Sequence, residues 1–367
     1  MRVLLEDGFS IEKGTGVGRY TQNLASELRR HPEIELLPQP ARRFIRKIRP
    51  LGARRTVYAT WLETGFQNQI RKLDPDLIHF TNHLVPNARK SNAKYAVTVH
   101  DLTAWKLPEA FSSVYVRYFR SVVTRSVKIA DLVLCPSDSI RKEVIEQFNL
   151  AETKVRTAWN ADSQLPEILP DRQEELRRQL HKRLGLQKPY ALFVGTLELR
   201  KNVTALVQAF ARLAGAFDLQ CVLVGKRGYG FSEIEDSIRH QACRDRYILT
   251  GFVTDEELAL LYKLADVFAY PSRYEGFGIP LVEAMSFGLP IVASRIAASE
   301  EVAADAAVYY DDPLNYEALA AKMSEVLSSS ALRCELGSRG RLRARKFTWK
   351  NVASMYIDAY KVPLNAC

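Results

Sequence analysis

Residues 267–285 read V-F-A-Y-P-S-R-Y-E-G-F-G-I-P-L-V-E-A-M. The first four residues are apolar or aromatic, which is typical of a buried strand. The two glycines within 271–278 indicate a loop, and Pro280 suits the first position of a helix that runs to Phe287. This reading places Glu283 in the first turn of the helix. A strand, a short loop and a helix in this order predict one unit of a parallel α/β sheet.

The same alternation of short apolar runs with longer helical patterns extends through both halves of the chain. In the first half, the predicted strands are Val3–Leu5, Leu77–Phe80, Tyr95–His100 and Asp131–Cys135, and the predicted helices are Val17–Arg30, Ser113–Ile129 and Ser139–Asn149. In the second half, the strands are Tyr190–Val194, Leu219–Val224, Tyr247–Leu249, Val267–Tyr270 and Pro290–Ala293, and the helices are Asn202–Ala214, Asp255–Ala265, Pro280–Phe287 and Tyr316–Ser328. This rhythm favours two doubly wound α/β domains.

The chain length and the prolines locate the boundary between these domains. A chain of 367 residues is long for one hydrophobic core. Pro166, Pro170 and Pro189 bracket a highly charged helical segment, Asp171–Arg183, which fits a linker with its own helix. We therefore predict an N-terminal domain over residues 1–165, a linker over 166–188, a C-terminal domain over 189–346 and a terminal segment over 347–367.

The positive charge is concentrated in the first half of the chain. The net charge is +10, of which residues 1–165 carry +9 and the remainder carries +1. Within residues 42–55, basic residues alternate with apolar ones, which suits an anionic membrane surface or a phosphorylated, lipid-linked acceptor. A solvated basic loop that packs on the domain explains the pattern equally well. We expect no nucleic acid partner, because no RNA-recognition or helix-turn-helix pattern accompanies the charge.

The cysteines and histidines argue against a disulfide framework and against a metal centre. The five cysteines are an odd number and include no C-x-x-C pair, which favours a reduced, cytoplasmic compartment. His79 and His83 are four residues apart but lack the H-E-x-x-H pattern, so we expect no metal site. The N-terminal run Arg2–Leu5 is too short for a signal peptide, and no stretch approaches the ~18 apolar residues of a membrane-spanning helix. We expect a cytoplasmic protein, peripheral to the membrane if residues 42–55 bind it.

Two glycine-containing stretches follow strands and begin helices, where backbone N–H groups are available to an anion. G-T-L-E-L-R-K-N, at Gly195–Asn202, adds the adjacent cations Arg200 and Lys201, which could converge on a diphosphate. The alternative is a solvated basic pair in the first helical turn. G-T-G-V-G, at Gly14–Gly18, departs from the G-x-G-x-x-G spacing and is explained as well by a tight turn as by a phosphate loop.

Two carboxylates eight residues apart, Glu275 and Glu283, would lie about 80° out of register on one continuous helix. They can face one site only if Glu275 lies in the loop and Glu283 in the helix. Carboxylates accept paired hydrogen bonds from vicinal diols, which indicates a ribose or hexose ligand, and the Gly276 and Gly278 amides could approach an anion. Alternatively, Glu283 interacts with the helix dipole and Glu275 is an exposed loop residue.

These residues resemble the E-x7-E signature of the retaining glycosyltransferases of family 4. Further motifs agree in the family's order through the C-terminal domain: Gly195–Asn202, Val222–Lys226, Leu249–Leu258, Leu261–Ser272 and Gly288–Ser294. The first domain matches more thinly, through Gly14–Tyr20 and V-T-V-H-D at Val97–Asp101. The resemblance implies the GT-B fold, in which two Rossmann-like domains face a central cleft and the last helix crosses back to the first domain.

The resemblance also implies a function and a set of site residues. A hexose, glucose-like or mannose-like, would pass from a UDP- or GDP-sugar to a glycan or lipid-linked sugar acceptor in cell-surface polysaccharide synthesis. The catalytic residues would be His100, Arg200, Lys201 and Glu275, with Asp101 as a companion of His100. The donor-binding residues would be Gly16, Gly195, Gly251, Phe252, Val253, Gly276, Phe277, Gly278 and Glu283. No metal or other cofactor would be required, because the two cations stabilise the leaving phosphate.

One position departs from the pattern of many relatives. They carry a basic residue directly after the first glycine of the phosphate motif, where this chain has Thr196, so Arg200 would have to supply the second positive charge. Two other functions stay open: a nucleotide-sugar epimerase, which would need no acceptor, and a non-enzymatic basic module that binds membrane or nucleic acid. The presence of Glu275, Glu283 and Lys201 speaks against the module, since a binding protein would be free to lose them.

Overall fold

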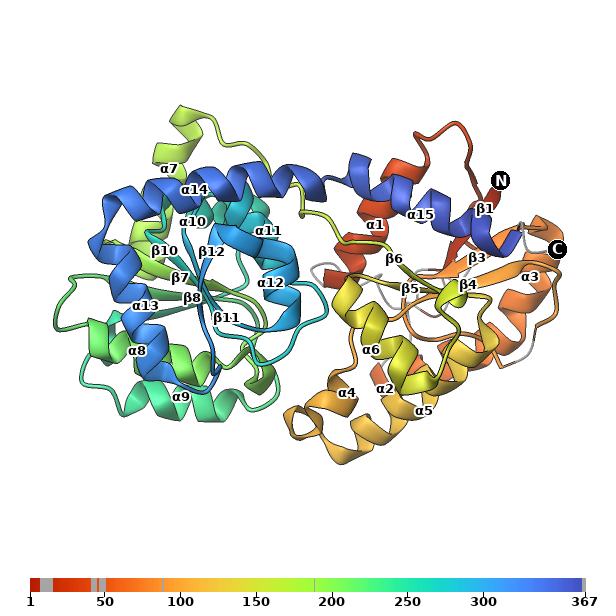
Figure 1. The fold of residues 1–367 in the computed structure, drawn as a ribbon, viewed down its shortest axis with the longest axis horizontal. Helices are drawn as coiled ribbons and strands as arrows, with labels where there is room; N and C mark the ends of the chain where they lie inside the picture. The colour runs from red at the N-terminus through yellow and green to blue at the C-terminus, as the bar shows by residue number, and fades with distance from the viewer. Residues whose placement is uncertain (7–15, 41–44, 46–50, 88, 188, 365–367) are drawn as a thin grey trace. The chain divides into compact units, whose positions relative to one another are not determined.

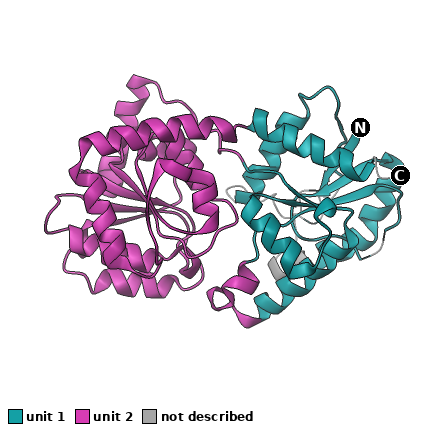
Figure 2. Cartoon of the chain, viewed as in Figure 1, with its two compact units in different colours: residues 1–102, 114–160, 349–367 teal, residues 103–113, 161–348 magenta. Residues whose placement is uncertain are grey.

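A computed structural model describes residues 1–6, 16–40, 45, 51–87, 89–187 and 189–364. The chain divides into two compact units, coloured teal and magenta in Figure 2. Unit 1 comprises 1–102, 114–160 and 349–367, and unit 2 comprises 103–113 and 161–348. The segment 103–113 thus lies in unit 2 and not in the N-terminal domain, where the sequence analysis placed it. One contact that holds it there is the ion pair of Glu109 with Arg273, at 2.8 Å.

Unit 1 is built on a parallel six-stranded sheet in the order β2-β1-β3-β4-β5-β6 (Figure 1). Its strands are β1 (Arg2–Glu6), β2 (Glu35–Leu36), β3 (Leu77–Phe80), β4 (Lys94–Thr98), β5 (Leu132–Cys135) and β6 (Val155–Thr157). Its helices are α1 (Gly16–Leu28), α2 (Leu51–Glu63), α3 (Gly65–Leu73), α5 (Ser113–Ile129), α6 (Asp138–Phe148) and α15 (Trp349–Leu364). The interior strands β3 and β5 are buried throughout, as expected of a sheet covered on both faces.

Unit 2 repeats this architecture in the order β12-β11-β10-β7-β8-β9. Its strands are β7 (Tyr190–Val194), β8 (Gln220–Val224), β9 (Tyr247–Gly251), β10 (Val267–Tyr270), β11 (Ile291–Ser294) and β12 (Ala307–Tyr310). Its helices are α4 (Thr103–Lys106), α7 (Pro170–Leu184), α8 (Val203–Leu213), α9 (Phe231–Arg239), α10 (Asp255–Leu264), α11 (Ile279–Ser286), α12 (Ala297–Ala303), α13 (Tyr316–Ser328) and α14 (Ser330–Ala344). In Figure 1, α8, α9 and α13 cover one face of this sheet, and α10 and α11 cover the other.

Two doubly wound α/β sheets confirm the predicted fold class. In unit 1, β4 ends at Thr98, so His100 lies in the loop after the strand and not in the strand as predicted, and the helices α2 and α3 were not predicted. The strands β2, β6 and β12 were not predicted. The first two have only two and three residues, too few to show a periodic pattern.

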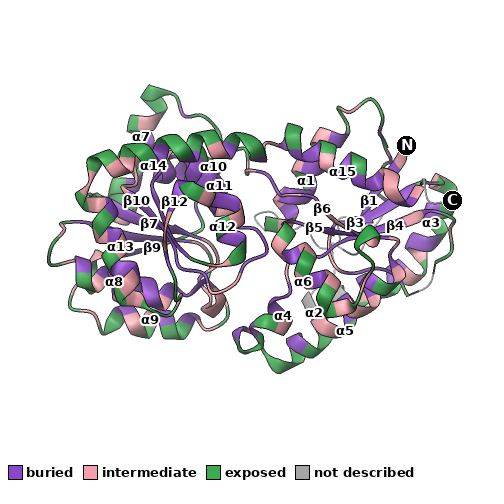
Figure 3. Ribbon diagram, viewed as in Figure 1, coloured by how far each residue is buried: buried purple, intermediate pink, exposed green. Residues whose placement is uncertain are grey.

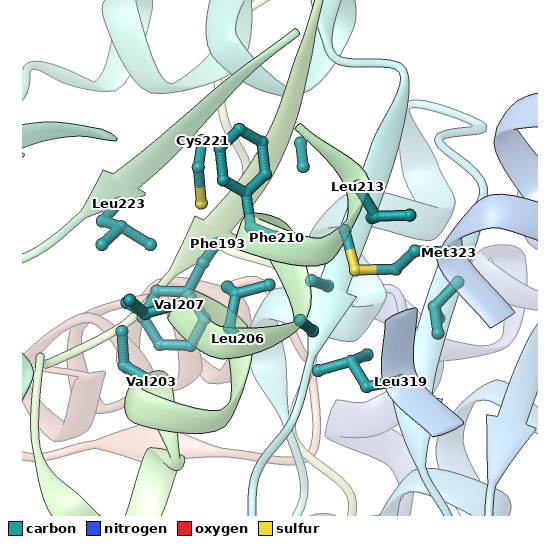
Figure 4. Close-up of a cluster of buried hydrophobic side chains, with 14 of the residues drawn as sticks. Phe193, Val203, Leu206, Val207, Phe210, Leu213, Cys221, Leu223, Leu319 and Met323 are labelled. Carbon is teal, nitrogen blue, oxygen red and sulfur yellow. The ribbon is translucent and has the colours of Figure 1, made fainter. Parts of the chain in front are cut away.

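One buried apolar cluster of unit 2 lies between the sheet and the helices α8 and α13. Figure 4 shows aromatic and aliphatic side chains from these elements in contact, among them Phe193, Phe210 and Met323. Cys221 lies in the same cluster and is fully buried. Figure 3 shows that burial is concentrated in the strands, whereas the outer faces of the helices are exposed. Burial of this much apolar surface is the dominant favourable contribution to the stability of the unit.

Two helices near the predicted boundaries pack within single units. In the predicted linker, α7 is tied to α10 by ion pairs of Arg172 with Glu256, at 2.8 Å, and of Arg183 with Glu257, at 2.5 Å. In unit 1, α15 packs against α1, β4 and β5. The Tyr356 hydroxyl in α15 donates to the carbonyl oxygen of Ala158, at 3.1 Å.

Candidate active site

The stretch that begins with β10 has the predicted strand–loop–helix form. β10 is buried and lies between β7 and β11 in the sheet. The following loop ends at Gly278, whose φ of 102° is unfavourable for any residue with a Cβ atom. A Cβ atom on Gly278 would also lie 2.8 Å from the hydroxyl oxygen of Tyr270. Gly278 is therefore required for the turn that leads from the strand into α11.

Glu275 lies in this loop and is held by two cations from the loop after β7. Its Oε1 lies 2.5 Å from Nζ of Lys201, and its Oε2 accepts a 2.6 Å hydrogen bond from Nη1 of Arg200. The glutamate side chain is 7% exposed. Burial alone would raise the pKa of Glu275, but the charges of Arg200 and Lys201 outweigh it and hold the pKa at about 2. Glu275 is thus an ionised, fixed carboxylate and not an exposed loop residue.

Lys201 is also nearly buried, with 9% of its side chain exposed. Burial lowers its pKa, and the negative charge of Glu275 acts in the opposite direction. The ammonium group also lies 5.6 Å from the centre of the Tyr270 ring. A solvated basic pair in the first helical turn does not describe this environment, because Lys201 points into the protein.

Arg200 makes contacts on both edges of its guanidinium group. Nη1 donates to Glu275 and to the carbonyl oxygen of Tyr274, at 2.9 Å. Nε and Nη2 both donate to Oε1 of Glu198, at 3.1 and 2.9 Å. The main-chain oxygen of Arg200 accepts a 2.9 Å hydrogen bond from the amide of Arg273, which joins the two loops directly.

The loop after β7 is fixed by the neighbouring loop after β8. The amide of Gly195 donates to Val224, and Leu197 forms a β-bridge with Arg227. Gly225 is required at this crossing, because a Cβ atom there would lie 1.9 Å from the carbonyl oxygen of Gly195. The backbone at the carboxyl end of β7 is therefore set before any ligand binds.

Glu283 lies in α11 and is 4% exposed. It is the fifth residue of the helix, because α11 begins at Ile279, so the expectation that it occupies the first turn was wrong. This position argues against a role at the helix dipole, whose effect is confined to the first turn. The Tyr262 hydroxyl of α10 donates to Oε2 of Glu283 at 2.7 Å, which fixes the direction of the carboxylate.

The remaining predicted donor-binding residues of unit 2 lie in two loops. Gly251 ends β9 with a φ of 65°, and Phe252 after it is 74% exposed, whereas Val253 is buried. Phe277 is also buried and packs edge to face against Phe347. The side chain of Phe277 is therefore used in packing within unit 2.

His100 belongs to unit 1 and follows β4. Its Nε2 lies 2.8 Å from the carbonyl oxygen of Thr81, and its ring meets that of Tyr20 edge to face. Because a carbonyl oxygen only accepts hydrogen bonds, Nε2 carries the proton, and in the neutral ring Nδ1 is an acceptor. Burial lowers the pKa of His100, and the contact with Thr81 and the charge of Asp101 act against it.

The other predicted residues of unit 1 differ in their surroundings. Gly16 is the first residue of α1, with open space where a side chain would be, whereas Gly14 lies outside the described residues. Most of the basic stretch 42–55 also lies outside them. Both ring nitrogens of His79 are used within the unit, at 2.7 Å from the Tyr360 and Thr98 hydroxyl oxygens. Burial lowers the pKa of His79 to about 3.

The structure thus brings Glu275, Arg200 and Lys201 together, and it places Gly16 and His100 in the other unit. Glu198 was not predicted as a site residue, although it lies two residues before Arg200 in the same motif. Tyr262 was not predicted either, because no local pattern associates it with Glu283.

The described residues add two observations. They contain no group of three or more His, Cys, Asp or Glu side chains arranged to hold a metal ion. No helix among them combines the length and the apolar character needed to cross a membrane.

Comparisons with known proteins identify the family and the fold of the chain. Residues 173–343 match the family described as glycosyl transferases group 1, and residues 14–161 match glycosyltransferase family 4. The O-antigen chain mannosyltransferase B of Escherichia coli is 33% identical over 293 residues, which are 78% of this chain and 74% of that protein. The structure of sucrose-phosphate synthase from Thermosynechococcus elongatus covers 100% of this chain and 99% of its own, with a TM-score of 0.76 and 21% identity. The structure of WaaG, a glycosyltransferase involved in lipopolysaccharide biosynthesis, covers 98% of this chain and 99% of its own, with a TM-score of 0.73 and 17% identity.

Two parallel doubly wound units place the protein in the GT-B class of folds. The chain belongs to the group 1 glycosyltransferases, and the predicted resemblance is confirmed.

Proposed function

We propose that the protein transfers mannose from a nucleoside-diphosphate sugar to a hydroxyl group of a glycan or lipid-linked sugar, with retention of the anomeric configuration, in polysaccharide synthesis. The cluster of Lys201, Glu275 and Arg200 carries this proposal. It places two cations and an ionised carboxylate at the carboxyl ends of neighbouring strands, where open α/β sheets bind ligands.

The family resemblance assigns a role to each of these residues and to their neighbours, and the chemistry of each residue suits its role. Lys201 and Arg200 stabilise the negative charge that develops on the β-phosphate as the bond to the sugar breaks. Glu275 and the backbone of Gly276–Gly278 hold the sugar, and Glu283 holds the ribose hydroxyl groups. The two cations supply positive charge without a metal ion.

The state of Glu275 supports a front-face mechanism. A carboxylate with a pKa of about 2 and a cation on each oxygen is a weak nucleophile, which disfavours a covalent intermediate on this residue. Instead, the bond from the anomeric carbon to the phosphate oxygen breaks, and the acceptor oxygen forms its bond on the same face. The acceptor proton passes to the leaving phosphate.

The choice of mannose rests on the relatives. The E. coli protein at 33% identity is a mannosyltransferase that acts on the O-antigen chain. A Mycolicibacterium hassiacum relative, 36% identical over 164 residues, is also a mannosyltransferase, although the match covers only 40% of its length. These names favour mannose over the glucose-like alternative.

We place the reaction in the cytoplasm, in line with the unpaired cysteines. Cys135, Cys221, Cys243 and Cys334 are all free thiols. An acceptor linked to a lipid would bring the enzyme to the inner face of the membrane, and the basic stretch 42–55 remains our candidate for that contact.

The test is an assay of the purified chain with GDP-mannose, GDP-glucose, UDP-glucose or UDP-mannose and a mannose-terminated acceptor. The expected product carries a new α-linked mannose, identified by NMR of its anomeric proton, and EDTA leaves the rate unchanged. A β-linked product would contradict retention, and transfer of glucose alone would contradict the choice of sugar. Incubation with donor alone separates an epimerase, which would convert the sugar without an acceptor.

A further inference from the structure

Glu198 is the residue of this site for which neither the sequence motif nor the proposed chemistry provides a role. Its side chain is 14% exposed, and its Oε1 accepts from both Nε and Nη2 of Arg200. A carboxylate beside Arg200 weakens the attraction of that cation for a diphosphate. If Arg200 served only to bind phosphate, Glu198 would oppose its function.

The position of Glu198 is set by the backbone. It has extended backbone angles, directly before the single 3-10 turn Leu199–Lys201 that carries both cations. The loop after β8 packs closely on it, because a Cβ atom on Gly228 would lie 2.8 Å from Cβ of Glu198. Glu198 therefore has little conformational freedom. It can hold the side chain of Arg200, which would otherwise sample many rotamers.

Arg200 is thus clamped between two carboxylates. The Nε–Nη2 edge is fixed on Glu198, which directs Nη1 toward Glu275 and the carbonyl oxygen of Tyr274. The charges of Glu198, Arg200, Lys201 and Glu275 balance to zero. Arg200 is the cation that would replace the positive charge missing at Thr196. It therefore belongs to a network around Glu275 that has no net charge.

We propose that Glu198 is a positioning residue that acts on Glu275 through Arg200. It holds the guanidinium group so that the glutamate keeps one orientation before the donor binds, and no rearrangement is then needed during the reaction. This inference rests on the proposed function, because Glu275 is the group that contacts the transferred sugar.

The inference gives opposite expectations for binding and turnover. Replacing Glu198 with Gln keeps its shape but leaves the network with a net charge of +1 and releases Arg200 toward the diphosphate. Affinity for a nucleoside diphosphate should stay the same or rise, whereas kcat should fall because Glu275 is no longer fixed. A merely structural residue would weaken both and lower the melting temperature.

The experiment compares wild type, Glu198→Gln and Glu198→Ala by calorimetry with GDP and UDP and by steady-state transfer kinetics. We expect kcat to fall about 10-fold for Gln and about 100-fold for Ala, with Kd for the nucleotide unchanged or lower. Glu317→Gln is the matched control, because Glu317 forms a 2.8 Å pair with Arg212 that is half exposed. The control should keep wild-type kcat and Kd.

The outcomes separate this inference from the proposed function. If the wild type is active and both Glu198 variants keep its kcat, the role of Glu198 is overturned while the proposed function stands. A loss that is confined to nucleotide affinity has the same consequence. If the wild type binds neither nucleotide and transfers no sugar, the proposed function falls and this inference falls with it.

Discussion

Nζ of Lys201 and Oε1 of Glu275 are 2.5 Å apart, and both side chains are less than a tenth exposed. The two residues are far apart in sequence and meet because β7 and β10 are hydrogen-bonded neighbours in the parallel sheet. The register pairs Ala191 with Val267 and Leu192 with Phe268, so both strands end at the same edge. A charge pair this deeply buried is costly to break, because removal of one partner leaves the other uncompensated.

Lys201→Ala should reduce turnover much more than donor binding. In the proposed function the lysine charge acts mainly on the phosphate as it leaves, and the loss of one such group would cost about 100-fold to 1000-fold in kcat. Steady-state kinetics and calorimetric affinity for the donor give the two quantities. Equal losses in both would mean that Lys201 recognises the ground state instead.

The matched control for this variant is Arg212→Ala. Arg212 also pairs with a carboxylate in unit 2, but its side chain is 55% exposed. Exposed pairs contribute little, so the control should keep the activity of the wild type and its free energy of unfolding within about 1 kcal/mol.

Glu275→Gln should destabilise the protein in a pH-dependent manner. Burial would raise the pKa of Glu275, but Arg200 and Lys201 lower it from 4.5 to about 2. A carboxylate with a lowered pKa in the folded state contributes stability that is fully present above pH 4.5 and is lost as the pH falls toward 2. The difference in unfolding free energy between wild type and variant should therefore be on the order of 3 kcal/mol at neutral pH and shrink in acid.

Urea unfolding of both proteins at about pH 7 and about pH 3.5 measures this difference. Glu317→Gln serves again as the control, because its exposed carboxylate should give a small difference at either pH. A difference for Glu275→Gln that is the same at both pH values would show that the ion pairs do not hold the carboxylate ionised.

The sequence alone predicted the elements that carry the site but not all the contacts within it. The apolar runs at Tyr190–Val194 and Val267–Tyr270 predicted two buried strands, and both are present. Their adjacency in the sheet has no local signal, because strands in a parallel sheet are joined by long crossovers. The family resemblance therefore placed Lys201 and Glu275 in one site, and their ion pair was found only in the structure.

Glu198 and Tyr262 show two reasons why contacts were missed. Glu198 was visible in the motif, but its pairing with Arg200 depends on the short 3-10 turn that follows it. Tyr262 is in α10 and Glu283 in α11, and their contact depends on how these two helices pack. Helix packing is set by many side chains at once, so no spacing in the sequence indicates it.

Tyr262→Phe should weaken nucleotide binding without abolishing it. The tyrosine hydroxyl donates to Glu283, so its removal would leave the carboxylate less well oriented for the ribose hydroxyl groups that the proposed function assigns to it. A hydrogen bond to a charged group contributes about 1.5–3 kcal/mol, which corresponds to a 10-fold to 100-fold weaker Kd. Glu283→Ala should abolish measurable binding, and calorimetry with the nucleoside diphosphate compares the two variants.

If Tyr262→Phe binds the nucleotide as tightly as wild type while Glu283→Ala does not bind, Glu283 needs no orienting partner. If both variants bind normally, the role of Glu283 at the ribose is wrong. Tyr316→Phe is a suitable control, because Tyr316 lies at the start of α13 and packs against Arg212.

His100 should be a neutral ring with the proton on Nε2 at physiological pH. Burial lowers its pKa below 6.5 and outweighs the contact with the carbonyl oxygen of Thr81 and the charge of Asp101, which favour the protonated form. If His100 contacts the transferred sugar, as the family resemblance implies, Nδ1 is the acceptor for a sugar hydroxyl, and protonation in acid would remove that acceptor. Transfer activity that depends on this group should be constant above about pH 6.5 and fall only at lower pH.

Nitrogen-15 NMR of the labelled protein reports the tautomer of His100 directly, and His100→Ala assigns the signal. His240 provides an internal reference for the opposite tautomer. Its Nδ1 lies 2.7 Å from the carbonyl oxygen of Asp236, at the exposed end of a helix. We expect a protonated Nε2 and an unprotonated Nδ1 for His100. A protonated Nδ1 would mean that the ring can only donate to the sugar, and the loss of activity in acid would then need another titrating group.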